Sequence, residues 1–175
     1  MKSRMEFKMS SPMVIGVDIG KEVFHLVGFA AGGKIAFRRR IRRLGLKDAF
    51  EKLPPCIVAM EACLSAHFVS RTLRALGHEP RIIPAIYVRP FVKGQKNDYN
   101  DAEAIAEAAL PPNLRFVQEK SQDQLDLQRA TGCGPIGVPS TATINQIRAF
   151  LIEQGIAVRA GPRAGPPQVA LRDTR

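Results

Sequence analysis

Four acidic residues lie at positions that suit metal-ion chemistry. Asp18 stands near the end of the apolar run MVIGVDI, and Glu61 directly follows the apolar run CIVAM. Asp98 and Asp101 open a segment rich in helix-forming residues, and their D-x-x-D spacing places both on one helix face. Carboxylates brought together repel one another unless a cation lies among them, and their oxygen atoms suit Mg²⁺ or Mn²⁺. These four residues are therefore candidate metal ligands.

A metal site of this kind would serve phosphodiester chemistry. Two ions about 4 Å apart would activate a nucleophile and stabilise the leaving oxygen. Each residue also has a purely structural explanation. An aspartate after an apolar strand is common in turns, Asp98 would cap a helix, and Asp101 would favour the first helical turn electrostatically. On the residues alone, both explanations stay open.

Apolar runs separated by turn residues predict the elements that must position these side chains. Runs at 13–19, 22–30 and 34–41 predict an antiparallel meander of strands, the last two joined by the glycine-bearing turn at 31–33. Strands and helices then alternate: a helix at 45–53, a strand at 56–60, a helix at 65–76, a strand at 80–86 and a helix at 101–110. This order predicts an α/β fold with a mixed sheet and flanking helices. Carboxylates at the ends of neighbouring buried strands then face one crevice.

The pattern also divides the chain. Residues 1–12 are predicted to be a flexible N-terminus, and residues 13–120 to form the α/β domain. Helical composition continues over 121–158, where it is interrupted at 129–140 by glycines and prolines. Residues 159–175 have the composition of a disordered tail.

The chain is strongly basic, with 26 Lys+Arg against 16 Asp+Glu and a formal net charge of +10. This excess predicts a polyanionic partner, most simply nucleic acid. Arginine forms paired hydrogen bonds with phosphate oxygens, so the run RRRIRR at the end of the third strand is the strongest candidate for phosphate contact. The alternative is a solvated edge strand that its charge protects from aggregation. The candidate nucleic-acid-binding residues are Lys21, Arg38, Arg39, Arg40, Arg42, Arg43, Lys93 and Lys96.

Several classes of protein are excluded. No apolar run is long enough to span a membrane, and the start MKSRMEFKMSSPM lacks the apolar region of a secretory signal. The odd number of cysteines, without a CxxC spacing, fits free thiols in a reducing cytoplasm. The histidines lack the HExxH spacing of a helix-borne zinc site. His25 lies within an alternating strand, and we expect it to be structural rather than catalytic.

Three short segments carry a resemblance to a known family. They are Val17-Asp18-Ile19-Gly20-Lys21, Met60-Glu61-Ala62-Cys63 and Lys96-Asn97-Asp98-Tyr99-Asn100-Asp101-Ala102. Their order and spacing resemble the N-terminal domain of the DEDD transposases of the IS110 group of insertion sequences. The resemblance covers residues 13–128 and resumes at 141–158, and it implies an α/β RNase H-like (RuvC-like) fold.

The resemblance also implies a function for the site. Asp18, Glu61, Asp98 and Asp101 would be the DEDD metal ligands, with Mg²⁺ or Mn²⁺ as the cofactor. Proteins of this family cut and rejoin DNA, at the element ends and the target, during transposition. A structured guide RNA encoded by the element takes part, and the full-length proteins are expected to be homo-oligomers.

The sequence departs from the family in two places. Family members continue into a second domain that supplies a serine nucleophile and helps to build the oligomer, whereas this chain ends first. We therefore expect little or no transposition activity from the chain by itself. The stretch 129–140 lacks the basic helical pattern of the family, which a local frame disruption in the gene would explain.

The sequence thus predicts the N-terminal catalytic domain of an insertion-sequence transposase that cleaves and transfers DNA strands with a metal ion. Two alternatives stay open. A RuvC-type Holliday-junction resolvase shares the strand-end Asp, the strand-end Glu and a D-x-x-D pair. A non-catalytic remnant that binds DNA or RNA would keep the basic surface without the chemistry.

Overall fold

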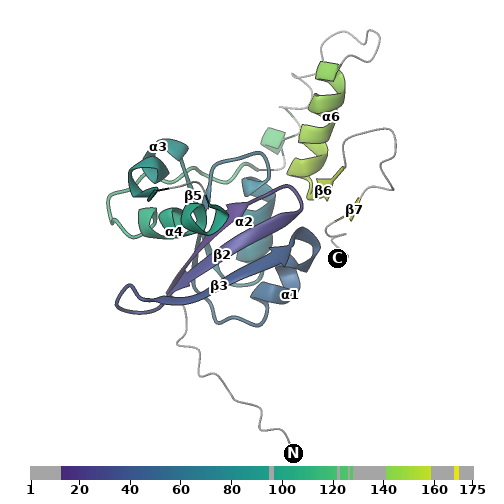
Figure 1. Cartoon of the computed structure of the whole chain (residues 1–175). Coiled ribbons are helices and arrows are strands. Elements are labelled where there is room, and N and C mark those ends of the chain that lie inside the picture. Colours follow the sequence, from purple (N-terminus) through teal and green to yellow (C-terminus); the bar gives the residue numbers. More distant parts are fainter. Residues whose placement is uncertain are drawn as a thin grey trace, which may run out of the picture.

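A mixed sheet lies at the centre of the part of the chain that the structure describes, which comprises residues 13–94, 97–121, 123–125, 127, 141–158 and 168–169 of a computed structural model (Figure 1). The five strands of this sheet lie in the order β3-β2-β1-β4-β5. Their bounds are β1 Val14–Ile19, β2 Val23–Phe29, β3 Ile35–Arg42, β4 Ile57–Glu61 and β5 Glu79–Ile83. Strands β1, β2 and β3 pair antiparallel, whereas β4 pairs parallel with both β1 and β5. The predicted α/β class, the antiparallel meander and the mixed RNase H-like sheet are confirmed.

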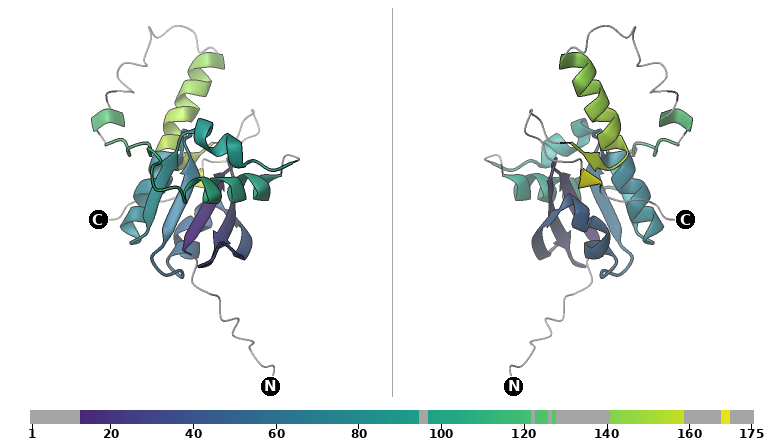
Figure 2. Two further views of the ribbon diagram at one scale, coloured as in Figure 1. Left: turned by 90° about the vertical axis from the view of Figure 1, so that its left-hand side faces the viewer. Right: turned by 90° about the vertical axis from the view of Figure 1, so that its right-hand side faces the viewer.

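Helices cover both faces of the sheet, and Figure 2 shows α2 and α4 on opposite sides of it. The helices are α1 Leu46–Phe50, α2 Ala66–Ala75, α3 Ala85–Val88, α4 Asp98–Ala108 and α6 Thr141–Glu153, with 3-10 turns η1 Arg43–Gly45 and η2 Arg89–Phe91. We call the side of the sheet under α4 the α4 face and the side under α1 and α2 the α2 face. Each face is sealed by its own apolar cluster.

Alternation along the strands assigns each side chain to a face. In β1, Val14 packs in the cluster beneath α4, while Ile15 and Val17 pack in the cluster beneath α2. In β4, Ala59 lies on the α4 face and Met60 on the α2 face. Because successive side chains point to opposite faces, the last residue of each strand has a fixed direction.

Gly16 allows α4 to lie directly on β1. A Cβ atom at Gly16 would come within 2.0 Å of the Ala102 carbonyl oxygen and 2.9 Å of the Ala106 Cβ atom. Small side chains on both surfaces therefore permit an approach that any larger residue would block. This close packing fixes the first turn of α4 beside the end of β1.

Two boundaries differ from the prediction. Helix α4 begins at Asp98 rather than at Asp101, because the Asn97 side chain accepts a hydrogen bond from the Tyr99 backbone N–H at 2.9 Å and caps the helix. Strand β5 ends at Ile83, and a short helix follows Pro84 in place of the predicted strand end. The other strands and helices predicted between residues 13 and 110 are confirmed within a few residues.

The C-terminal part is described only in pieces. Helix α6 packs against α2, where the Arg71 guanidinium donates to the Glu153 carbonyl oxygen at 3.3 Å. Strand β6 Ile156–Ala157 pairs antiparallel with β7 Gln168–Val169, which lies in the segment predicted to be a disordered tail. The predicted flexible N-terminus, the interruption at 129–140 and the rest of the tail lie outside the described residues. Within the described ranges, no helix combines the length and apolar character needed to cross a bilayer.

Candidate metal centre

The ends of β1 and β4 bring Asp18 and Glu61 side by side. The two strands are parallel neighbours in a register that pairs Val17 with Met60, so Asp18 and Glu61 follow at the next position. Val17 and Met60 both point to the α2 face, and the next residue of each strand therefore points to the α4 face. Both carboxylates are partly exposed there, at the carboxyl end of the strands.

The first turn of α4 supplies the other two acidic residues. Asp98 is the first residue of the helix and Asp101 lies one turn later, so both point from the same end of α4. Helix N-termini favour nearby negative charge, which offsets part of the repulsion between the carboxylates. Asp98 is not the helix cap, because Asn97 has that role.

The pKa of Asp18 is sensitive to the other acidic groups near it. The pKa of Asp18 is raised above its ordinary value, first by burial and then by the negative charges of Asp101 and Asp98. His25 opposes this rise, and Glu61 adds to it. The other three candidate ligands therefore lie near enough to Asp18, at one end of the sheet, for their charges to act on it.

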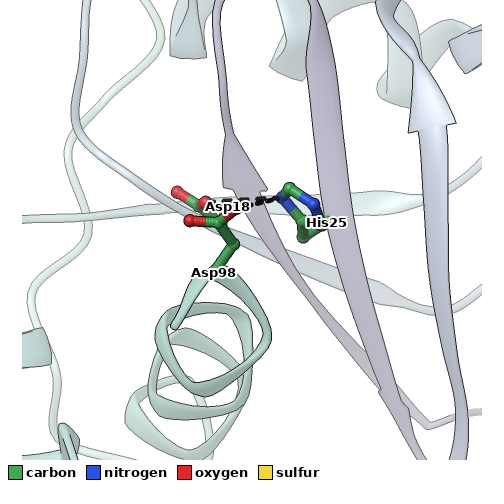
Figure 3. A group of neighbouring side chains, drawn as sticks. All are labelled: Asp18, His25 and Asp98. Atoms are coloured by element: carbon green, nitrogen blue, oxygen red, sulfur yellow. Dashed lines mark ion pairs between the residues drawn. The ribbon is translucent and has the colours of Figure 1, made fainter. Parts of the chain in front are cut away.

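His25 completes a tight group with Asp18 and Asp98, and Figure 3 shows the imidazole beside both carboxylates. The His25 Nδ1 atom lies 3.9 Å from Asp18 Oδ2 and 3.5 Å from Asp98 Oδ2. One ligand atom from each residue lies within 4.8 Å of the other two. Glu61 and Asp101 stand outside this tight group.

The sequence did not show that His25 would lie beside Asp18. Asp18 and His25 are direct cross-strand partners in the β1–β2 hairpin, so they share the α4 face. The signal in the sequence was the short turn at 20–22, which pairs residues on either side of it. The sequence did not fix the register of the hairpin, and it is this register that places His25 opposite Asp18.

The donor set suits a divalent cation. Among the described residues, no lysine or arginine forms an ion pair with Asp18, Glu61, Asp98 or Asp101. Lys93 instead donates a hydrogen bond to Glu107 and forms an ion pair with Glu103 of α4, and its hydrogen bond to Glu107 raises the pKa of Lys93. Grouped carboxylates without a cationic partner match the oxygen ligands of Mg²⁺ and Mn²⁺, and the His25 imidazole adds a nitrogen donor beside them.

The arginine run divides between the two faces of edge strand β3. Arg38, Arg40 and Arg42 pair across strands with Val27, His25 and Val23, so all three lie on the α4 face. Their side chains are exposed, and Arg38 forms an ion pair with Glu103 at 2.9 Å. Arg39 lies on the other face with its guanidinium over the Phe37 ring. Three arginines thus line the sheet edge beside the carboxylates.

Arg43 differs from the other arginines because it is only 5% exposed. Its guanidinium donates to the carbonyl oxygens of Lys21 at 2.9 Å and Gly20 at 3.0 Å, and to Ser65 Oγ at 3.2 Å. It also stacks over the Phe24 ring, and burial lowers its pKa. We therefore remove Arg43 from the candidate phosphate contacts. It ties the loop after β1 to the loop after β4, which are the loops that follow Asp18 and Glu61.

The lysine candidates have different surroundings. Lys21 is exposed in the loop after β1. Lys93 is exposed but is held by the carboxylates of α4. Lys96 lies outside the described residues.

Comparison with known proteins supplies the family. Residues 15–156 match the family model DEDD_Tnp_IS110, described as a transposase. A probable family 20 transposase of Pseudomonas aeruginosa is 45% identical over 152 residues, which is 86% of this chain and 45% of that protein. The transposase for insertion sequence element IS1328 of Yersinia enterocolitica is 40% identical, over 87% of this chain and 46% of that protein.

One more transposase and one solved structure are also similar to this chain. The transposase for insertion sequence element IS1111A of Coxiella burnetii is 40% identical over 89% of this chain and 43% of that protein. Among solved structures, T. thermophilus RuvC in complex with Holliday junction substrate matches 59% of this chain and 98% of that chain, with a TM-score of 0.46 and 12% identity. The chain spans less than half the length of these curated relatives. On the extent of the family match, this chain belongs to the DEDD transposases of the IS110 family.

Proposed function

We propose that this chain is the catalytic domain of a DNA transposase, in which Asp18, Glu61, Asp98 and Asp101 hold Mg²⁺ or Mn²⁺ for strand cleavage and transfer. The observation that carries the proposal is the approach of the other three acidic residues to Asp18 at one end of the sheet, where their negative charges raise the pKa of Asp18. Relatives that share the domain are named as transposases, which supports the same reading.

The residues of the chain divide the work. A metal held here would supply an activated nucleophile and charge stabilisation for the leaving oxygen. Asp18 and Glu61 hold their positions because they end paired strands, and Asp98 and Asp101 because α4 packs on Gly16.

The arginines of the edge strand would position the DNA backbone. Arg38, Arg40 and Arg42 lie on the α4 face, and their strand β3 is two strands from β1 and three strands from β4. A phosphate backbone lying across β3 would meet these guanidinium groups and then reach the carboxylates. Arg40 and Arg42, together with Lys21, have no ion pair within the described residues and are the candidates with the freest charge.

The finer partners follow from the family resemblance rather than from the geometry. We propose DNA element ends and target DNA as substrates, an element-encoded guide RNA as a partner, a homo-oligomer as the assembly of the full-length protein, and the cytoplasm as its location. The basic surface supports nucleic acid of either kind.

Metal binding gives the first test. Mn²⁺ titrated into the whole chain by calorimetry is expected to bind the wild type, and binding should fall at least tenfold in Asp18→Asn. Asp48→Asn is the matched control, because Asp48 is an exposed aspartate on α1 at the α2 face. Equal Mn²⁺ binding by wild type and Asp18→Asn would overturn the proposed site.

DNA cleavage gives the second test and separates the alternatives. Metal-dependent nicking of DNA bearing the element end, absent in Asp18→Asn, is the expected result. Selective cutting of four-way junctions that needs no element end would favour a resolvase instead. DNA or RNA binding that needs no metal and survives Asp18→Asn, without cleavage by wild type, would favour a non-catalytic remnant.

A further inference from the structure

The imidazole of His25 stands where a metal ligand would stand. It projects from β2 toward Asp18 of β1 and Asp98 of α4, so three different elements point one donor each at a common centre (Figure 3). Its side chain is 13% exposed, whereas the side chains of Asp18 and Asp98 are 32% and 61% exposed. The nitrogen therefore closes the buried side of the group, and the carboxylates open toward solvent.

The His25 Nδ1 atom forms no hydrogen bond in the described part of the chain. It is inaccessible to solvent and has no hydrogen-bond partner there. Buried polar atoms are almost always satisfied, so an unsatisfied one asks for an explanation. The ring is held in place by an edge contact with Tyr99, with centroids 5.1 Å apart and an interplanar angle of 76°. The nitrogen thus faces the carboxylates in a fixed orientation.

The distances distinguish a shared ion from a direct hydrogen bond. The separations of 3.5 Å and 3.9 Å exceed the roughly 2.7–3.2 Å of an N–H···O hydrogen bond. Two donors that each lie about 2.1 Å from one cation are about 3.0 Å apart at a right angle and about 4.2 Å apart when opposite. Both separations from the His25 Nδ1 atom fall inside that interval, as expected for a nitrogen that shares one ion with each carboxylate.

We propose that His25 Nδ1 is a direct ligand of the metal held by Asp18 and Asp98, and that it makes the site prefer Mn²⁺ to Mg²⁺. The inference deepens the proposed function and rests on it. Mg²⁺ takes oxygen ligands and loses water reluctantly, whereas Mn²⁺ accepts imidazole nitrogen as well as carboxylate. Ligation through Nδ1 requires the neutral ring with its proton on Nε2.

Electron spin-echo spectroscopy of the Mn²⁺-loaded whole chain tests the ligand directly. The wild type, prepared without a histidine tag, is expected to show ¹⁴N modulation that changes when histidine is labelled with ¹⁵N. The modulation should vanish in His25→Gln and persist in His67→Gln. His67 is the control because it lies on α2, and its Nδ1 atom accepts a hydrogen bond from the Lys120 backbone N–H at 3.3 Å.

Metal preference gives a second measurement. In His25→Asn, which offers an amide oxygen in place of the nitrogen, the Kd for Mn²⁺ should rise about tenfold and the Kd for Mg²⁺ should change much less. An unchanged ratio of the two Kd values would contradict the proposed preference.

The outcomes separate this inference from the proposed function. Mn²⁺ bound by wild type with no histidine modulation would overturn the role of His25 and leave the carboxylate site intact. Absence of any Mn²⁺ binding by the wild type would overturn both. The ¹⁵N labelling experiment uses the wild-type chain, so it decides the question even where His25→Gln fails to fold.

Discussion

Charged side chains have opposite surroundings on the two sides of the strand ends. At the Arg43 clamp, meaning Arg43 with its three hydrogen-bond acceptors, one cation meets the Gly20 and Lys21 carbonyl oxygens and a serine hydroxyl. At the proposed metal site, the other three acidic residues raise the pKa of Asp18, and none of the four carboxylates has a lysine or arginine partner within the described residues. The Arg43 guanidinium is held by acceptors of the protein itself, and only its Nη1 atom has no hydrogen-bond partner among the described residues. The clamp thus joins two loops, whereas the proposed metal site gathers negative charge that a bound cation would offset.

The largest expected effect comes from Gly16→Ala. The added Cβ atom would lie 2.0 Å from backbone oxygen of α4, so the helix must shift away from β1. We expect a loss of about 3 kcal/mol in the free energy of unfolding, with Mn²⁺ affinity falling at the same time because Asp98 and Asp101 move from Asp18. Urea denaturation and Mn²⁺ calorimetry measure the two effects. Unchanged Mn²⁺ binding would show that α4 does not position the site.

Arg43→Met tests the clamp. The substitution keeps an unbranched side chain over Phe24 but leaves the acceptors of the guanidinium without their donor, so we expect a loss of about 2 kcal/mol in urea denaturation. Arg42→Met is the matched control, because Arg42 is the exposed residue directly before Arg43 at the end of β3, and it should change stability by less than about 0.5 kcal/mol. If both variants lost the same free energy of unfolding, the buried hydrogen bonds of Arg43 would not stabilise the fold.

Asp18→Asn should have the opposite sign from the clamp variant. In the absence of metal it removes a charge that three other carboxylates repel, so the melting temperature should rise by about 2 °C. In the presence of Mn²⁺ the wild type should gain stability and the variant should not. A variant less stable than wild type in chelator would contradict the comparison between the two regions.

The same carboxylate predicts a pH dependence. Since the pKa of Asp18 is raised in the folded protein, the folded state holds the proton more tightly than the unfolded chain does. Its contribution to metal-free stability is therefore largest below the unfolded value of 3.8 and falls as pH rises through the raised folded pKa. Mn²⁺ affinity should increase over the same interval, because the ion competes with that proton. Calorimetry at several pH values, with Asp18→Asn as reference, checks both trends.

The smallest effect on stability is expected from the edge-strand arginines. Replacing Arg38, Arg40 and Arg42 together by alanine should change the free energy of unfolding by less than about 1 kcal/mol, since their side chains are exposed. DNA affinity should fall, and the slope of log K against log salt should drop by about 3. Arg39→Ala, on the other face, should change that slope least. An equal effect from Arg39 would argue against binding across the α4 face.

Local signals in the sequence were enough for the strands and for the acidic residues. The apolar runs before Asp18 and Glu61 place both residues at strand ends, and the D-x-x-D spacing places Asp98 and Asp101 on one helix face. The sequence did not show which residues of neighbouring strands pair with each other. His25 reaches the site only through the hairpin register.

The direction of a side chain at a turn was equally hidden. Arg43 follows four exposed arginines in sequence, yet it turns inward because the chain enters the 3-10 turn η1 at that residue. The arginine run predicted phosphate contact for all its members, whereas the backbone exposes four of them and buries Arg43. The start of α4 was also hidden in the sequence, because only the hydrogen bond from the Tyr99 backbone N–H to the Asn97 side chain shows that the helix begins at Asp98.

The β1–β2 hairpin has a consequence for how such proteins diverge. Asp18 and His25 face each other across a turn so short that inserting or deleting one residue would slip the pairing and rotate the imidazole to the opposite side of the sheet. The length of this turn would then be tied to the identity of the ion. Lineages that changed it would be expected to shift from manganese toward magnesium without altering a single acidic residue.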